Sequence, residues 1–469
     1  MSSSLELFDV VERFLYSREA GGRGRPDDRV REGSTMTQRK HFKQLVRARM
    51  EKTGESYATS RRIVLHNAPI ENSKTDLHFP GNIPATTALR NVLTRTGVVD
   101  PHTKRPFTES MLFGIAGGIG AGMFTFLYEK ADFASFFVAG RHSWMDDEAY
   151  LVSACKRLGV ETVVKESSGV KPGEKHLREL LAEYGACIVW VDAAGLPHRA
   201  MPAHFSGCGY HVVTIYSIDD QTGKATVGDL TDEPISIPLA DLAAARMRIK
   251  KFKNRLLAVK PGRASADVRE LVQSGLQACV HGLTKQKIKN FTLESFKQWA
   301  DRLHASKDKE SWERIFTLGK RLWQGLTSIY DYIEHYGTGG GLCRPIFADF
   351  LNEAGAALNN AKLKALALRY DELGRNWTEL AKAALYPGVP LFKKAQQLLA
   401  EKAELVAAGA SAEEVRNTWI KLDALAKEAS ECFPLNAKQA DTLRADLQKR
   451  VQSLYVGESS ALAAIQAVL

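Results

Sequence analysis

Residues 78–128 read HFPGNIPATTALRNVLTRTGVVDPHTKRPFTESMLFGIAGGIGAGMFTFLY, and this stretch decides the fold. It contains a turn at residues 79–82, a helix that begins at Pro84, a polar connector and an apolar run rich in glycine. Proline suits the first position of a helix, because its missing N–H would be unpaired there and its φ angle is already helical. Apolar residues then recur at helical spacing, at Ala88, Leu89, Val92 and Leu93. The start of a buried helix is also where proteins place an activated thiol, and no cysteine stands at this one.

Length and composition place the chain among ordinary globular proteins. Its 469 residues suffice for two or three domains, with 44% apolar and 25% charged residues. The formal net charge of +10 favours acidic partners such as nucleic acid, anionic lipid or an acidic carrier protein. The 6 cysteines form neither CxxC pairs nor metal-ligand spacings with histidine. We therefore expect a reduced, cytoplasmic protein without a disulfide framework, metal or cofactor.

Two segments raise the question of targeting or membrane insertion. Residues 1–16 carry acidic side chains and no sustained apolar core, so they do not resemble a signal peptide. The glycine- and charge-rich sequence that follows predicts a disordered extension over residues 1–35, with Met36 as a second candidate start. Residues 110–128 carry no charge, but their many glycines and the flanking glutamates favour a buried, closely packed segment over a membrane span.

A basic helical hairpin is predicted over residues 36–66, with a break at residues 53–56. Its basic residues are Lys40, Lys43, Arg47, Arg49, Lys52, Arg61 and Arg62. This charge is typical of a surface that contacts nucleic acid or another acidic partner. No base-reading motif accompanies it, so we favour a solvated face on a packing element.

We divide the rest of the chain into an α+β domain over residues 67–260 and a helical domain over residues 261–469. Strands are predicted at residues 161–165, 186–192, 210–218, 225–229 and 256–260, and a helix at residues 239–248. A turn at residues 219–223 joins two of these strands as a hairpin. Hairpin-joined strands after early helices favour an antiparallel sheet over a doubly wound one.

Two glycine-rich motifs are candidates for phosphate binding. The run at residues 114–122 lacks the third glycine of a dinucleotide loop, because that position is Met123, and we expect it to serve close backbone packing. The loop at residues 338–344 places flexible N–H groups and an arginine before a helix. That arrangement suits an anion site and equally suits a tight connector between helices, so both interpretations stay open. The candidate ligand-binding residues are Glu109, Thr338, Gly339, Gly340, Gly341 and Arg344.

His211 and Asp229 are the candidate acid–base pair. His211 lies at the start of one strand of the predicted hairpin, and Asp229 lies at the end of its partner. Two such strands bring the side chains close enough for a carboxylate to orient an imidazole.

Several segments together carry a family resemblance. They occur in the order FPGNIPATTALRNVL, TESMLFGIAGGIGAG, AGRHSW, YHVVTIYSID and VGDLTDEPISIPLADLAAAR. This order resembles the N-terminal domain of the butirosin biosynthesis protein H family, papain-like acyltransferases that act on carrier-bound acyl groups. Downstream, GTGGGLCRPIFADFLNEA resembles the helical domain of unknown function that accompanies it, so the resemblance covers about residues 70–460. It implies a papain-like α+β fold, His211 as general base and Asp229 as its orienting acid.

The chain departs from this family at the nucleophile. The family places a histidine and then a cysteine at the helix start, and those positions are Ile83 and Pro84 here. Proline offers neither a nucleophilic atom nor the backbone N–H that would stabilise an oxyanion. Cys208 is a weak alternative nucleophile, because on a continuous strand it and His211 would point to opposite faces.

We therefore predict a catalytically degenerate acyltransferase homologue, a pseudoenzyme that binds a small ligand, a peptide or an acidic acyl-carrier partner. The alternative is an active acyltransferase or amide-forming enzyme of secondary metabolism that uses His211 and Asp229 with a non-standard nucleophile. A third and less favoured hypothesis is a nucleic-acid-associated protein that uses residues 37–65. We expect no membrane partner, and the sequence leaves the oligomeric state open, a homodimer included.

Overall fold

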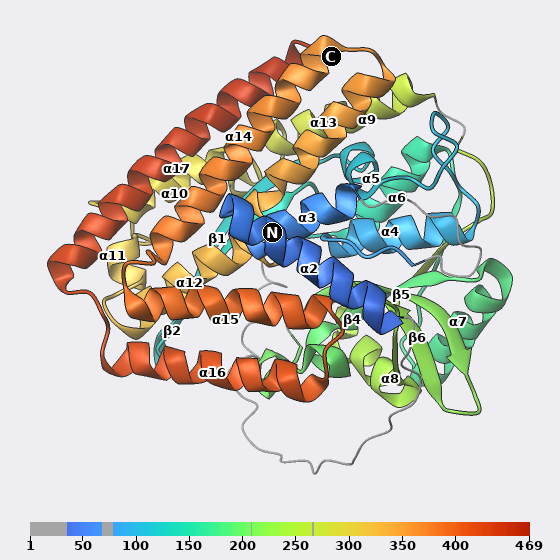
Figure 1. Cartoon of the computed structure of the whole chain (residues 1–469), viewed down its shortest axis with the longest axis horizontal. Helices are drawn as coiled ribbons and strands as arrows, with labels where there is room; N and C mark the ends of the chain where they lie inside the picture. The colour runs from blue at the N-terminus through green and yellow to red at the C-terminus, as the bar shows by residue number, and fades with distance from the viewer. Residues whose placement is uncertain (1–34, 68–77, 208, 265–266) are drawn as a thin grey trace.

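The computed structural model describes residues 35–67, 78–207, 209–264 and 267–469 (Figure 1). The predicted extension at the N-terminus therefore lies almost wholly outside the described residues, and so does Cys208. The predicted hairpin of two helices is present as α2 (Thr35–Thr53) and α3 (Tyr57–Asn67).

Six strands of the described chain form one antiparallel sheet, in the order β3-β8-β4-β5-β6-β7. Their bounds are β3 (Thr162–Lys165), β8 (Leu256–Val259), β4 (Cys187–Asp192), β5 (Tyr210–Asp219), β6 (Lys224–Gly228) and β7 (Ile235–Pro238). Because side chains alternate along a strand, the sheet offers two apolar faces. Trp190 and Val212 pack into the core that contains helix α4, whereas Val191 and Val213 pack into the core that contains helices α7 and α8. The antiparallel sheet confirms the predicted α+β class.

Four helices accompany this sheet: α4 (Pro84–Arg95), α6 (Asp147–Leu158), α7 (Val170–Tyr184) and α8 (Leu239–Arg248). Helix α4 has Leu89, Val92 and Leu93 buried on its apolar face, as the spacing predicted. It packs against β5. Helix α8 has the bounds that the sequence predicted.

The glycine-rich run is a buried helix followed by a strand. Helix α5 (Glu109–Ile115) leads into β1 (Ile119–Tyr128), which pairs with β2 (Phe133–Arg141) as an antiparallel hairpin. A Cβ atom added at Gly114 would lie 2.1 Å from Cγ of Phe350, so the backbone approaches that ring too closely for any other residue. The expectation of close packing is confirmed, and within the described residues no helix is long and apolar enough to cross a membrane.

From α9 onward the chain is helical. The elements are α9 (Val268–Thr284), α10 (Glu294–Leu303), α11 (Trp312–Ile315), α12 (Lys320–Glu334), α13 (Arg344–Ala357), α14 (Ala361–Ala384), α15 (Pro390–Ala407), α16 (Ala412–Glu431) and α17 (Ala437–Gln466). Helices α9 and α10 contact β1, and α12 contacts β2, so helical elements pack against the β1–β2 hairpin (Figure 1). Phe136 of β2 contacts the rings of Trp299 and Trp312, with centroids 4.8 and 5.3 Å away. One continuous core therefore joins the sheet-bearing and helical parts.

Candidate functional site

The start of α4 is held by a carboxylate from another helix. Ile83 is the N-cap residue and makes no side-chain cap, and Pro84 follows at the first helical position. Instead, Oε1 of Glu109 accepts the backbone N–H groups of Asn82 and Ile83, at 2.8 Å each. Thr87 donates its hydroxyl to the same oxygen at 2.9 Å. The positive end of the helix dipole thus already faces an anion supplied by the protein.

His211 and Asp229 lie together, as their positions on β5 and after β6 led us to expect. Nε2 of His211 is 2.8 Å from Oδ1 of Asp229, and the two residues are 7% and 3% exposed. The backbone N–H of Leu230 donates to the same carboxylate oxygen at 2.8 Å. Because Nε2 contacts the carboxylate, Nδ1 is the ring nitrogen of His211 that does not face Asp229.

Two further residues complete this cluster, and sequence reasoning missed both. The short helix η4 (Pro197–Arg199) presents His198 and Arg199 to Asp229. Arg199 donates Nε to Oδ2 and Nη2 to Oδ1, at 2.9 Å each, which is the two-point geometry of a strong ion pair. Nε2 of His198 lies 2.8 Å from Oδ2. The carboxylate of Asp229 therefore contacts three side chains, not His211 alone.

Arg199 also changes the chemistry of His211. Its Nη2 atom lies 2.9 Å from Nε2 of His211, the nitrogen that contacts Asp229. Nε2 donates to Asp229 when it carries a proton and accepts from Arg199 when it does not, so the two neighbours stabilise opposite tautomers.

The pKa shifts in the cluster follow from this arrangement. Burial and the charge of Arg199 lower the pKa of His211 below its usual value, which keeps the imidazole neutral. Burial alone would raise the pKa of Asp229, but Arg199 and His211 outweigh it and hold the pKa well below its usual range. A neutral imidazole can act as a base but cannot form the cationic half of a thiolate–imidazolium pair.

Arg61 of α3 joins the two parts of the site. Its Nη1 donates to the carbonyl of Gly81, three residues before Pro84, at 2.8 Å. Its Nη2 donates to the carbonyl of Leu230, directly after Asp229, at 2.9 Å, and to Asp232 at 2.8 Å. The α4 start and the Asp229 loop thus bind one buried guanidinium.

With this geometry established, comparison with known proteins identifies the region. Residues 84–230 match the family model described as butirosin biosynthesis protein H, N-terminal. This region is therefore similar to that family. Residues 240–418 match a domain of unknown function (DUF4872), so the resemblance seen in the motifs is confirmed for both parts. No curated protein matches the chain.

Strands of the one six-stranded sheet fall into both family matches. The matches meet between residues 230 and 240, so β8, which lies between β3 and β4, falls within the second one. The boundary predicted from the sequence, at residues 260 and 261, would instead keep the sheet whole.

The second glycine-rich loop covers the start of α4 in the butirosin-H-type region. Gly337, Gly339, Gly340 and Gly341 all have positive φ angles, which explains their identity. A Cβ atom added at Gly337 would lie 3.0 Å from Cδ of Pro84, and one at Gly339 would lie 3.1 Å from Cβ of Asn82. The loop therefore lies directly against the start of α4.

The remaining candidate ligands at this loop make contacts within the protein. Arg344 is 0% exposed and donates Nε to Glu458 of α17 at 2.6 Å and Nη1 to the carbonyl of Leu342 at 2.7 Å. Thr338 donates its hydroxyl to the carbonyl of Ile333 at 2.9 Å. These contacts favour the interpretation of the loop as a tight connector.

The basic hairpin and the helical part also lie against the site. Of its basic residues, Arg61 and Arg62 are only 4% and 5% exposed, and Arg62 pairs with Asp349 of α13. From α16, Nε1 of Trp419 donates to the carbonyl of Arg199 at 3.4 Å. The packing interpretation of the hairpin fits its two buried arginines.

Within the described residues, neither thiols nor metal ligands provide another reactive group near these side chains. Burial raises the pKa to about 12 for each of four thiols: Cys155, Cys187, Cys279 and Cys343. The described residues contain no group of three His, Cys, Asp or Glu side chains arranged to hold a metal ion.

Proposed function

We propose that this protein is a catalytically degenerate, papain-like acyltransferase homologue. The family of residues 84–230 suggests an acyltransferase-like function. One observation supports the proposal of degeneracy: Pro84, which the motif resemblance places at the family's cysteine, begins helix α4, and Glu109 accepts the N–H groups just before it. Nucleophile and anion-binding donors are therefore lost at the same helix start.

The electrostatics of that helix start oppose acyl transfer by any nucleophile placed there. An acyl-transfer intermediate carries a negative oxygen, which enzymes stabilise with backbone N–H donors. Here the carboxylate of Glu109 uses two such donors, and its own charge would repel a second anion a few ångströms away. A buried carboxylate at this point is compatible with packing and incompatible with an oxyanion hole.

The role that remains is binding. We propose that the protein holds a small ligand, a peptide or an acidic acyl-carrier partner in a pathway of secondary metabolism. The formal net charge of +10 supports an acidic partner, because complementary charge accelerates and orients encounter.

One observation favours the alternative of an active enzyme. His211 is neutral, oriented by Asp229 at 2.8 Å and thus chemically competent as a base. In this alternative a non-standard nucleophile, such as Cys208 or a bound amine, would attack the acyl group and His211 would accept its proton.

Intact-protein mass spectrometry after incubation with acyl thioesters of N-acetylcysteamine tests both hypotheses. The protein should carry Cys432→Ala, because this exposed cysteine would otherwise react without catalysis. We expect no acyl adduct and no thioester loss above the buffer rate. Stoichiometric acylation, or turnover with an added amine, that disappears in His211→Ala or Cys208→Ala would refute degeneracy.

A binding experiment completes the test. Calorimetric titration with a non-hydrolysable acyl-pantetheine ether measures binding without requiring chemistry. The variant Arg61→Met should weaken this binding by releasing the two carbonyls that Arg61 holds beside the site, at Gly81 and Leu230. The variant Arg47→Met removes an equal charge from an exposed position and serves as the control. Equal affinity in both variants would contradict a ligand site here.

A further inference from the structure

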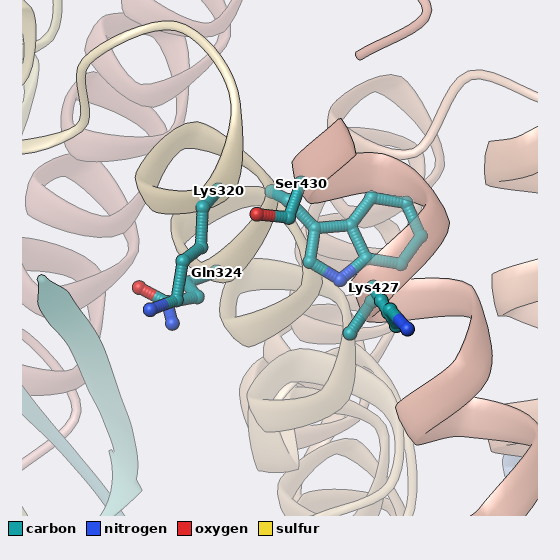
Figure 2. Close-up of a pocket in the computed structure, with 6 residues that line it drawn as sticks. Lys320, Gln324, Lys427 and Ser430 are labelled. Atoms are coloured by element: carbon teal, nitrogen blue, oxygen red, sulfur yellow. The ribbon is translucent and has the colours of Figure 1, made fainter. Parts of the chain in front are cut away.

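Two hollows on the described part of the chain differ in how their charged groups are paired. The hollow between α12 and α16 has a volume of about 290 Å³, and Figure 2 shows Lys320 and Lys427 extending from the two helices beside it. Lys320 interacts with Asp132 and Lys427 with Glu431, so the protein itself supplies counter-charges there. The other hollow, of about 380 Å³, lies between the α4–α5 loop and α13, and its charged groups are less fully paired.

This second hollow has side chains of both charges in its wall. It is lined by two carboxylates, one guanidinium, two hydroxyls and a proline ring, from Asp100, Thr103, Arg105, Pro106, Thr108 and Glu353. Its volume is at the lower end of the range for small-molecule sites. Five of its six lining residues are polar or charged, so charge and hydrogen bonds determine which ligand fits it.

Asp100 offers an acceptor to this hollow. The residue is only 6% exposed. Its Oδ1 atom accepts the backbone N–H groups of His102 at 2.7 Å and Thr103 at 3.2 Å. Within the described ranges, its Oδ2 atom has neither a hydrogen-bond donor nor a cationic partner. A carboxylate oxygen without a protein donor is free to accept from a ligand in the hollow that it lines.

Glu353 is the second acceptor. Its two oxygens accept the hydroxyl groups of Thr108 and Ser110, which use two of the roughly four acceptor positions of a carboxylate. Nδ1 of His66 lies 3.9 Å from Oε1, which is beyond hydrogen-bond length. Burial raises the pKa of Glu353, and the two hydroxyls only partly oppose this shift. The ionised carboxylate therefore lacks compensating positive charge, which a cationic ligand would supply.

Arg105 provides the opposite charge. Its side chain is exposed, and among the residues that the structure describes its guanidinium has no acceptor. The backbone N–H of Asp100 donates to the carbonyl of Arg105 at 2.9 Å, so the two residues lie side by side at the closed end of the loop. Because Arg105 pairs with neither carboxylate of the hollow, all three charged groups can contact one ligand.

We propose that this hollow binds a basic α-amino acid such as lysine. Arg105 donates to the α-carboxylate of the ligand, and Asp100 and Glu353 accept from its two ammonium groups. The wall carries two negative charges and one positive charge, and the ligand carries the reverse set. The inference goes beyond the proposed function, since none of the lining residues belongs to the Asp229 cluster or to the start of α4.

Calorimetric titration of the full chain with L-lysine tests the proposal. L-Lysinamide lacks the carboxylate charge, and L-norleucine has the same four-carbon side chain without the ε-ammonium group. We expect saturable binding of L-lysine and binding at least about tenfold weaker for each comparison compound, the loss that corresponds to one charge-assisted hydrogen bond. No binding of L-lysine, or equal binding of the three compounds, would overturn the proposal.

Matched variants assign the contacts. Arg105→Gln should weaken binding of L-lysine about tenfold and leave binding of L-lysinamide unchanged, because that compound has no carboxylate for Arg105. Asp100→Asn keeps the Oδ1 acceptor for the backbone N–H groups and should weaken binding of both compounds about tenfold. The controls Lys104→Gln, on the same loop, and Asp301→Asn, on α10, remove the same charges from exposed positions and should leave affinity unchanged. The proposal fails if either control matches its test variant, or if Arg105→Gln weakens binding of both compounds equally.

Discussion

Replacing Glu109 by alanine should destabilise the fold far more than replacing it by glutamine. The carboxylate accepts the backbone N–H groups of Asn82 and Ile83, the side-chain amide of Asn82 and the hydroxyl of Thr87, all at 2.8–2.9 Å. Glu109 is 9% exposed, so water cannot easily replace it. Each buried donor left without an acceptor costs about 1–3 kcal/mol, and two of these donors are fixed backbone groups. We therefore predict a loss of about 4 kcal/mol in the free energy of unfolding for Glu109→Ala.

Glutamine keeps one carbonyl oxygen for the backbone N–H groups, and the amide of Asn82 can rotate to meet its new N–H₂. We predict a loss of about 1–2 kcal/mol for Glu109→Gln, the difference between charged and neutral acceptors. Urea unfolding followed by far-ultraviolet circular dichroism measures both values. The exposed Glu129→Ala serves as control and should change stability by less than about 0.5 kcal/mol. The reasoning fails if Glu109→Ala costs no more than Glu109→Gln.

Three further predictions concern one buried ion pair and two buried histidines. Arg344→Met leaves Glu458 as an unpaired buried charge and should lower the free energy of unfolding in urea by about 3–5 kcal/mol. Adding Glu458→Leu to this variant should recover part of the lost stability, and no recovery would contradict the pairing. Burial and the neighbouring arginines lower the pKa of His142 from 6.5 to about 4 in the folded chain. Between these two pH values the unfolded chain binds a proton at this histidine and the folded chain does not. The free energy of unfolding should thus fall as pH falls from 6.5 to 4, and His142→Gln should flatten this slope. Arg199→Met should raise the pKa of His211 in an NMR titration of the imidazole; an unchanged pKa would exclude Arg199 as a cause.

Local pattern was sufficient to predict most of the regular structure. Apolar β-branched runs bounded by turn residues located β4 and β5 to within one residue, and periodicity located α8. The division of the glycine-rich run into α5 and β1 was not predicted. Gly117 and Gly118 make that turn with φ angles of +112° and +62°, and glycine carries no apolar periodicity that would reveal it.

The candidate site was predictable only where neighbouring strands determine proximity. His211 and Asp229 meet because β5 and β6 are consecutive strands joined by a turn. His198 and Arg199 reach the same carboxylate from a loop whose path no local pattern specifies. Glu109 was a candidate ligand, yet its partners are backbone groups more than 20 residues earlier, a contact that depends on tertiary packing.

The central position of β8 bears on how this gene could evolve. The strand lies in the interior of the sheet but follows the point where the two family matches divide, and the β1–β2 hairpin lies among helices encoded some 150 residues later. Recombination at that division would remove an inner strand from one product and leave the other without the hairpin against which α9, α10 and α12 pack. We therefore expect that neither half, expressed without the other, would form the core that it has in the whole chain.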